Sequence, residues 1–358
     1  IDLTGKFKIG TENVLTVAVN NDFGKNKVPF GSSFDWPNDG GLIRKVKMIV
    51  THLVAPQAIY VTPTLHKDSS AIVKIRLPFN KAILEKKYAG LKGKLKLNIQ
   101  IAPELDQYKR MNNLPNLTLH ELARKQMVGD LVTPEWDGVN AYATVQIPKV
   151  MPWHIDFPNL YFVGIFVTTD SELIDVIGTT VGFRTVEFIN GQTHLNGERI
   201  KVMGVEWTAG SNPDYGFAET DSVILANCKL MKDVNAIFTR QHFQQDDLFY
   251  DFCDRNGILV QQEVPLLGPE TPASETIQTI ALSQLERMVS NMYNHPSIFS
   301  WGAGNELRAR DADMKPMITT LMKRSRELDP SRNTAYVSNT LTTSYYNNPK
   351  FVPDAAAD

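Results

Sequence analysis

The residues with the clearest chemical potential lie at the end of an apolar run. Residues 296–307 read Pro-Ser-Ile-Phe-Ser-Trp-Gly-Ala-Gly-Asn-Glu-Leu, and the run stops at the polar pair Asn305 and Glu306. If the run is a buried parallel strand, Glu306 lies at its C-terminal end, where an α/β barrel carries its chemistry. A carboxylate in that place is a candidate acid catalyst. The alternative interpretation is a surface glutamate that caps the following helix.

An alternation of strands and helices would position this carboxylate. Strands are predicted at residues 200–205, 235–239, 258–260, 298–301 and 335–338, and helices at 221–233, 246–255, 274–293 and 313–328. This rhythm is typical of a parallel sheet covered by helices. A (β/α)8 TIM barrel needs about 250 residues, so the chain after position 200 is expected to hold strands one to about five. A complete open α/β sheet is the competing interpretation, although no Gly-rich phosphate loop follows the first strand.

The first half of the chain has the pattern of a β-sandwich. Apolar residues alternate with polar ones in short runs that Gly, Pro, Asn and Asp interrupt. We expect strands at residues 13–19, 43–54, 71–77, 93–101, 141–147 and 160–168. Residues 103–135 are polar and predict a long loop or a short helical insertion.

Charge and composition exclude several classes of partner. The formal net charge is −2, so no broad basic surface suits nucleic acid or an anionic membrane. No uncharged apolar stretch reaches the roughly 18 residues of a membrane span. Cys228 and Cys253 fall in predicted helices and are expected to be buried thiols. The chain starts at Ile1 and shows no signal peptide, so export cannot be judged, and periplasm and cytoplasm both stay open.

Several segments resemble glycoside hydrolase family 2, which holds β-galactosidases, β-glucuronidases and β-mannosidases. The segment from Tyr293-Asn294-His295-Pro296 through Trp301 to Asn305-Glu306 is similar to the family's acid/base signature. Asp35–Arg44 resembles the closing signature of its N-terminal jelly-roll domain. Met151-Pro152-Trp153 and the exit Gly182-Phe183-Arg184 resemble its immunoglobulin-like domain. Further barrel segments follow in the family's order: Leu195-Asn196-Gly197, Leu230-Met231-Lys232, Tyr250-Asp251-Phe252 and Gly257-Ile258-Leu259-Val260.

The resemblance implies a multidomain β plus α/β chain. Residues 1–55 would end a jelly-roll β-sandwich, 56–186 would form an immunoglobulin-like β-sandwich, and 187–358 would form the first part of the TIM barrel. It also implies a retaining exo-β-glycosidase, with β-galactosidase as the first choice and β-glucuronidase or β-mannosidase as alternatives. Retention needs two carboxyl groups roughly 5 Å apart. Glu306 would be the general acid/base, and the nucleophile, on the family's strand seven, would lie outside this chain.

The resemblance also suggests substrate contacts at the ends of the other strands. Asn305 would bond the sugar 2-hydroxyl, unless it is only a turn residue. Arg240 and His242 end the second strand, where the family carries pocket residues, although His242 could equally pack in the core. Glu263 ends the third strand and either faces the pocket or pairs with an arginine such as Arg240.

Three further residues are candidates for substrate binding. Trp207 is a possible sugar-stacking platform, because an aromatic face packs against the C–H face of a pyranose. The commoner family pattern has Asn and His where this chain has Glu206 and Thr208, which hints at an altered specificity. Trp301 either touches sugar or is buried scaffold. Asp35 lies where some family members reach into the active site, or it caps a loop.

We predict no cofactor and no catalytic metal, because Leu266–Glu270 does not match the Glu and His ligands of some family β-galactosidases. The expected partner is an oligosaccharide or glycoside, with no nucleic acid and no membrane, and a homo-oligomer is left open. A second function stays open if this chain is the whole polypeptide. It would then be a non-catalytic carbohydrate-binding or assembly module.

Overall fold

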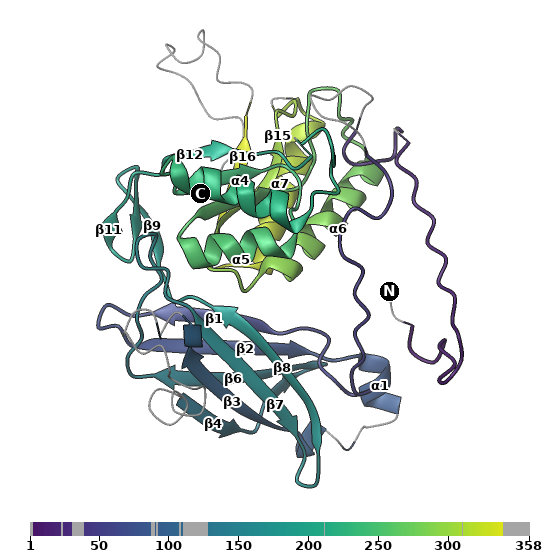
Figure 1. Cartoon of the computed structure of the whole chain (residues 1–358), viewed down its shortest axis with the longest axis vertical. Helices are drawn as coiled ribbons and strands as arrows, with labels where there is room; N and C mark the ends of the chain where they lie inside the picture. Colours follow the sequence, from purple (N-terminus) through teal and green to yellow (C-terminus); the bar gives the residue numbers. More distant parts are fainter. Residues whose placement is uncertain are drawn as a thin grey trace.

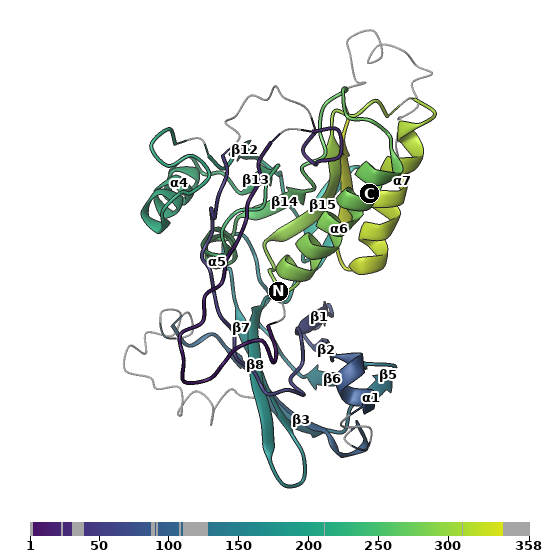
Figure 2. The same ribbon diagram turned by 90° about the vertical axis from the view of Figure 1, so that its right-hand side faces the viewer.

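The computed structural model describes residues 3–22, 24–30, 39–86, 90, 92–106, 109, 128–210, 212–309 and 311–338. A β-sandwich and a helix-covered parallel sheet lie one above the other, and a small hairpin sheet lies beside the parallel sheet (Figure 1). The view turned by 90° shows helices α6 (Glu275–Met292) and α7 (Met314–Leu328) together on one side of the parallel strands (Figure 2). Together these units confirm the predicted immunoglobulin-like domain followed by part of a TIM barrel.

The sandwich consists of two four-stranded antiparallel sheets. One sheet has the order β1 (Tyr60–Leu65), β2 (Ala71–Pro78), β6 (Asn140–Ile147) and β5 (Glu135–Asp137). The other has the order β4 (Val128–Val132), β3 (Lys96–Pro103), β7 (Tyr161–Thr168) and β8 (Leu173–Val181). Helix α1 (Lys81–Lys86) and a 3-10 turn at Lys92–Lys94 connect β2 to β3.

Alternation of apolar side chains builds the sandwich core. Every second residue of β2 is buried, as a strand with one face in a core requires. Ile75 of β2 pairs with Ala143 of β6, and Ile99 of β3 pairs with Ile165 of β7. These four residues belong to one buried cluster. The predicted strands at residues 71–77, 93–101, 141–147 and 160–168 are therefore confirmed, within three residues at each end.

The small hairpin sheet packs at the N-terminal ends of the parallel strands. It consists of β9 (Val186–Ile189), β10 (Gln192–Leu195) and β11 (Glu198–Arg199). Its two turns are Asn-Gly pairs with positive φ in both residues, which is the geometry of tight β-hairpins. The ring of Phe188 in β9 lies 5.9 Å from that of Phe299, and Phe299 lies 5.9 Å from Phe238. Phe299 and Phe238 belong to a core at this end of the parallel sheet, and the exposed Phe188 packs onto it.

The parallel sheet contains five strands in sequence order. They are β12 (Gly204–Glu206), β13 (Phe238–Gln241), β14 (Leu259–Glu263), β15 (Ile298–Asn305) and β16 (Asn333–Val337). Helices α4 (Asp221–Asp233), α5 (Asp247–Asn256), α6 and α7 connect them in turn. The predicted strand–helix alternation after residue 200 is confirmed.

Capping residues explain why the helix boundaries were predictable. Thr220, Asp246 and Ser274 are the N-caps of α4, α5 and α6, and each side chain accepts a hydrogen bond from a backbone N–H of the first turn. Gly257 ends α5 in the left-handed conformation with a φ of 68°. No described helix is both long and apolar enough to cross a membrane.

The expectation of strands at residues 13–19 and 43–54 is wrong. The structure assigns no strand there, because a strand needs a neighbour for its backbone hydrogen bonds and these residues have none within the described part of the chain. In the second of these stretches, Lys45 and Lys47 instead form ion pairs with the first turns of α4 and α5, with Lys45 2.7 Å from Asp221 and Lys47 2.7 Å from Asp247. A jelly-roll role for residues 1–55, and the boundaries at 55 and 186, stay predictions.

The two cysteines are buried and free, as expected. Part of the stretch at residues 103–135 lies outside the described residues. Within it, β4 and β5 form strands, which the prediction of a loop or helical insertion missed.

Candidate active site

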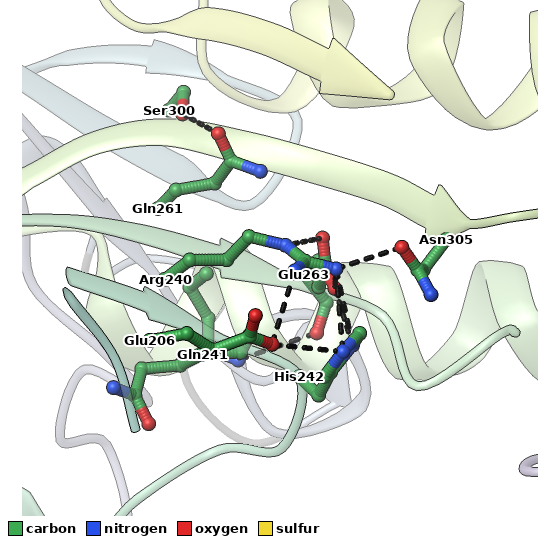
Figure 3. Close-up of polar contacts among 9 residues, drawn as sticks. Glu206, Arg240, Gln241, His242, Gln261, Glu263, Ser300 and Asn305 are labelled. Atoms are coloured by element: carbon green, nitrogen blue, oxygen red, sulfur yellow. Dashed lines mark hydrogen bonds and ion pairs between the residues drawn. The ribbon is translucent and has the colours of Figure 1, made fainter. Parts of the chain in front are cut away.

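The predicted polar residues gather at the C-terminal ends of neighbouring strands, with Arg240 at their centre (Figure 3). Arg240 ends β13, and its guanidinium donates to acceptors from three other strands. Nη1 lies 3.0 Å from Oε1 of Glu206, and Nη2 lies 2.9 Å from Oε1 of Glu263. Nη2 also lies 2.8 Å from Oδ1 of Asn305, and Nε lies 3.3 Å from Oε2 of Glu263. The planar fork of an arginine suits this bridging role, which one ammonium group could not fill.

Glu263 is the buried anion of the site. Its side chain is 0% exposed, whereas that of Arg240 is 18% exposed. Both carboxylate oxygens accept from Arg240, and Oε1 also lies 2.5 Å from Nδ1 of His242. A buried carboxylate is tolerated only when charges and hydrogen bonds compensate it. Of the two roles expected for Glu263, the structure therefore shows the pairing with an arginine.

His242 lies between two carboxylates. Its Nε2 is 3.0 Å from Oε1 of Glu206, and its Nδ1 faces Glu263. Its side chain is only 9% exposed, whereas that of Glu206 is 45% exposed. Glu206 therefore presents the accessible carboxylate of this cluster.

The backbone of Asn305 and Glu306 is held firmly at the end of β15. The N–H of Asn305 donates to the carbonyl of Leu266 at 2.9 Å, and that of Glu306 donates to the carbonyl of Val337 at 2.8 Å. Glu306 has a φ of 53°, which is uncommon for a residue with a side chain and clusters at functional sites. Gly304 has a φ of 145°, and a Cβ there would lie 2.8 Å from the Leu266 carbonyl oxygen.

Comparison with known proteins agrees with this geometry. A family model described as "Glycosyl hydrolases family 2, TIM barrel domain" matches residues 186–351, and one described as "Glycosyl hydrolases family 2" matches residues 51–184. The chain belongs to glycosyl hydrolase family 2.

Relatives within family 2 carry more than one activity in their names. A β-galactosidase of Thermoanaerobacter pseudethanolicus is 26% identical over 341 residues, which are 94% of this chain and 42% of that protein. A β-galactosidase of Thermoanaerobacterium thermosulfurigenes is 25% identical over 96% of this chain and 43% of its own length. The crystal structure of a β-glucuronidase from Parabacteroides merdae superposes with a TM-score of 0.72 at 22% identity, covering 89% of this chain and 39% of that chain. The chain thus spans less than half the length of these relatives.

The structure brings together four of the eight predicted site residues of this family 2 chain: Arg240, His242, Glu263 and Asn305. Glu306 follows Asn305 at the same edge, and its side chain is exposed. Asp35 lies outside the described residues. Glu206 was not among the predicted substrate-binding residues, although it pairs directly with Arg240 in the sheet register. Glu206 could have been predicted from its position at a strand end, where the family usually has Asn.

The two tryptophans face away from this cluster, which corrects the expectation for Trp301. Neighbouring residues of a strand point to opposite faces of the sheet. Trp301 pairs with Gln262, the neighbour of Glu263. An irregularity of β15 between Gly302 and Asn305 brings Asn305 back to the cluster. Trp301 is 0% exposed, and its indole N–H donates to Oδ2 of Asp329 at 2.9 Å on the helix side. Trp301 is therefore scaffold. Trp207 follows Glu206, is half-buried and packs its ring 5.5 Å from that of Phe249 in α5, on the helix side of the sheet.

One group of metal-type ligands lies elsewhere in the described residues. Asp251, Asp254 and His295 bring one donor atom each to within 4.8 Å of one another, near the N-terminal end of β15. Oδ2 of Asp254 is 2.6 Å from Nδ1 of His295, and its Oδ1 accepts from the N–H of Ser297. Asp254 and His295 thus already satisfy each other, and the group lies at the opposite end of the sheet from Arg240.

Proposed function

We propose that the protein containing this chain is a retaining exo-β-glycosidase with Glu306 as its general acid/base. One observation carries the proposal most directly. Asn305 and Glu306 end β15 at the edge where Arg240 fixes the Asn305 side chain by its Oδ1. That bond leaves the amide NH2 of Asn305 as a donor for a sugar hydroxyl.

The reaction would follow the two-step course of retaining glycosidases. The Glu306 carboxyl gives its proton to the glycosidic oxygen as the bond to the leaving alcohol breaks, and the resulting carboxylate then takes a proton from the attacking water. The nucleophile must be a second carboxylate. Glu263 is unsuited to that role, because its side chain is fully buried and both of its oxygens are hydrogen-bonded. We therefore do not assign the nucleophile to Glu263, and on the family resemblance we propose that it lies on a later strand of the barrel than the five described here.

A neutral sugar, with galactose first, fits the charges of the described site better than a glucuronate. Glu206 and Glu263 supply two carboxylates beside the Glu306 carboxyl group, whereas the Arg240 guanidinium is engaged by Glu206, Glu263 and Asn305. Glu206, 45% exposed, can accept hydrogen bonds from sugar hydroxyls but would repel a sugar carboxylate. Two relatives aligned over 94% and 96% of this chain are named β-galactosidases.

A β-glucuronidase is the second candidate, because structures of that class share the fold over most of the chain. A β-mannosidase and a non-catalytic carbohydrate-binding module remain alternatives that the same experiment separates. The full-length protein is incubated with the nitrophenyl β-galactoside, β-glucuronide and β-mannoside, and rates are measured for each. Fastest turnover of the galactoside supports the proposal, fastest turnover of another glycoside reassigns the sugar, and no turnover at all overturns the enzymatic assignment.

The role of Glu306 is tested by Glu306→Gln in the same protein. An amide cannot deliver the proton, so kcat/KM should fall by about 10²–10⁴-fold for substrates with alkyl leaving groups. Nitrophenyl glycosides should lose less in the bond-breaking step, because their leaving groups need little protonation. The control is Glu172→Gln, an exposed glutamate of the sandwich, which should leave kcat/KM unchanged. An equal loss for both leaving groups would contradict an acid role.

A further inference from the structure

A small cavity lies where the sandwich meets the N-terminal ends of the parallel strands. It has a volume of about 50 Å³ and is lined by residues of both units, among them Pro63 of β1, Arg184, Ser331 and Arg332. A single water needs about 10–15 Å³ by this measure. The cavity therefore has room for several waters or for one small ion.

Arg184 reaches this cavity with its charge unmatched. Its Nε donates to the carbonyl of Pro296 at 2.5 Å, and its Nη2 donates to the carbonyl of Ile298. Both partners are neutral, and within the described part of the chain no carboxylate lies within 4.0 Å of this guanidinium. Arg184 is half-buried, and an arginine that loses much of its contact with water is normally paired with an anion. The carbonyl dipoles compensate only part of the charge.

The second guanidinium in the wall, that of Arg332, occupies the nearby carboxylate that could otherwise compensate Arg184. Arg332 donates from Nε to the same Ile298 carbonyl at 3.1 Å and from Nη2 to the carbonyl of His295 at 2.8 Å. Its Nη1 lies 2.6 Å from Oδ2 of Asp329, so the Asp329 carboxylate is paired with Arg332. Two like charges thus share one carbonyl acceptor beside a cavity.

The pKa of Arg184 also indicates that its positive charge is not fully compensated. Burial and repulsion by Arg332 lower the pKa of Arg184 to about 9, although Asp329 and Asp254 act in the opposite direction. Each guanidinium has five N–H donors, and the contacts above use two on Arg184 and three on Arg332. Donors therefore remain on both residues, at a cavity that both line.

We propose that this cavity binds a small inorganic anion, of the size of chloride or phosphate, between Arg184 and Arg332. The anion would supply the charge that Arg184 lacks and would link the sandwich to the barrel, because the cavity wall contains residues of both. The site lies at the opposite end of the sheet from Glu306, so it does not depend on the glycosidase activity.

The test is the thermal stability of the full-length protein as a function of anion concentration. Ionic strength is held constant with gluconate, which is too large for the cavity, while chloride or phosphate replaces it. An anion that binds only the native state raises Tm in a saturable manner. We expect saturation in the millimolar range, whereas the general salting effect of phosphate grows without saturation at much higher concentrations.

Two matched variants identify the cavity as the cause. Pro63→Glu places a carboxylate in the cavity wall and should remove the saturable rise in Tm, whereas Pro63→Gln, of the same size, should keep it. Arg184→Met should also remove it, and the Pro63 pair keeps the test decisive if that variant does not fold. A wild type without a saturable rise, or a rise that persists unchanged in Pro63→Glu, would overturn the proposal.

Discussion

Arg240 is the residue on which the geometry of the active site depends most. It donates to Glu206, Glu263 and Asn305 and compensates a glutamate that is fully buried. Arg240→Met would leave the Glu263 carboxylate buried without its main counter-charge, which costs about 3–5 kcal/mol. We therefore expect a loss of that order in the free energy of unfolding, measured by urea denaturation.

The double variant Arg240→Met/Glu263→Gln separates this electrostatic cause from a loss of packing. Removing the second charge should restore part of the lost stability, because the uncompensated carboxylate is gone. Arg287→Met, an exposed arginine on α6, should change stability by less than about 0.5 kcal/mol. If the double variant is no more stable than Arg240→Met, the ion pair with Glu263 is not what the arginine contributes.

At the scale of elements, the C-terminus of α5 shows how one glycine joins the two units. Gly257 has a φ of 68°, and a Cβ there would lie 2.0 Å from the carbonyl oxygen of Ile155. Gly138, in the turn between β5 and β6, has a similar φ of 57° but open space around it. Alanine at Gly138 should cost only the left-handed penalty of about 1–2 kcal/mol. Gly257→Ala should cost clearly more, because the backbone at Ile155 must move.

Urea denaturation of both variants measures this difference directly. The Gly138→Ala variant is the control for backbone conformation, so the excess loss in Gly257→Ala reports the contact with Ile155. Equal losses in the two variants would show that the chain relaxes around the added methyl group at no cost.

Elements with local signals could be predicted from the sequence, and elements that depend on distant partners could not. The caps Thr220, Asp246 and Ser274 mark the starts of α4, α5 and α6, and the predicted starts lie within one residue of the observed ones. Residues 13–19 alternate like a strand, but pairing depends on a neighbour that the pattern does not contain. The Asn-Gly turns of β9–β11 were visible in the sequence and were not used to predict a hairpin.

The same distinction holds for the active site. Strand ends at the same edge of a parallel sheet must meet, so Arg240, His242, Glu263 and Asn305 could be predicted together. For Trp301 the sequence left both a sugar contact and a buried scaffold role open. The strand register decides the orientation of the Trp301 side chain, because it places Trp301 beside Gln262 on the helix side of the sheet. The sequence pattern alone does not give this register.

At the scale of the whole molecule, a network of hydrogen bonds joins the sandwich to the barrel. Asn294 accepts from the N–H of Val61 and donates to the carbonyl of Ile59, both at 2.9 Å. The indole N–H of Trp153 donates to the carbonyl of Asp254 at 2.8 Å. Asp254 also binds His295 through its carboxylate, so a titratable pair lies within the junction.

The junction should therefore make stability depend on pH. Burial disfavours the charged form of His295, but attraction and a hydrogen bond from Asp254, together with Asp251, outweigh it and raise the pKa of His295. A histidine whose folded pKa is raised stabilises the native state fully below its unfolded pKa of about 6.5. That contribution is lost as the pH rises through the higher folded pKa.

The test compares Tm between about pH 5.5 and 8.5 in the wild type and in His295→Gln, which cannot be charged. The wild type should exceed the variant most at the acidic end, and the difference should shrink as the pH rises past 6.5. His66→Gln, at an exposed histidine in the turn after β1, is the control and should follow the wild type at every pH. A difference between the wild type and His295→Gln that stays constant across this range would mean that His295 contributes only its shape and a neutral hydrogen bond to the junction.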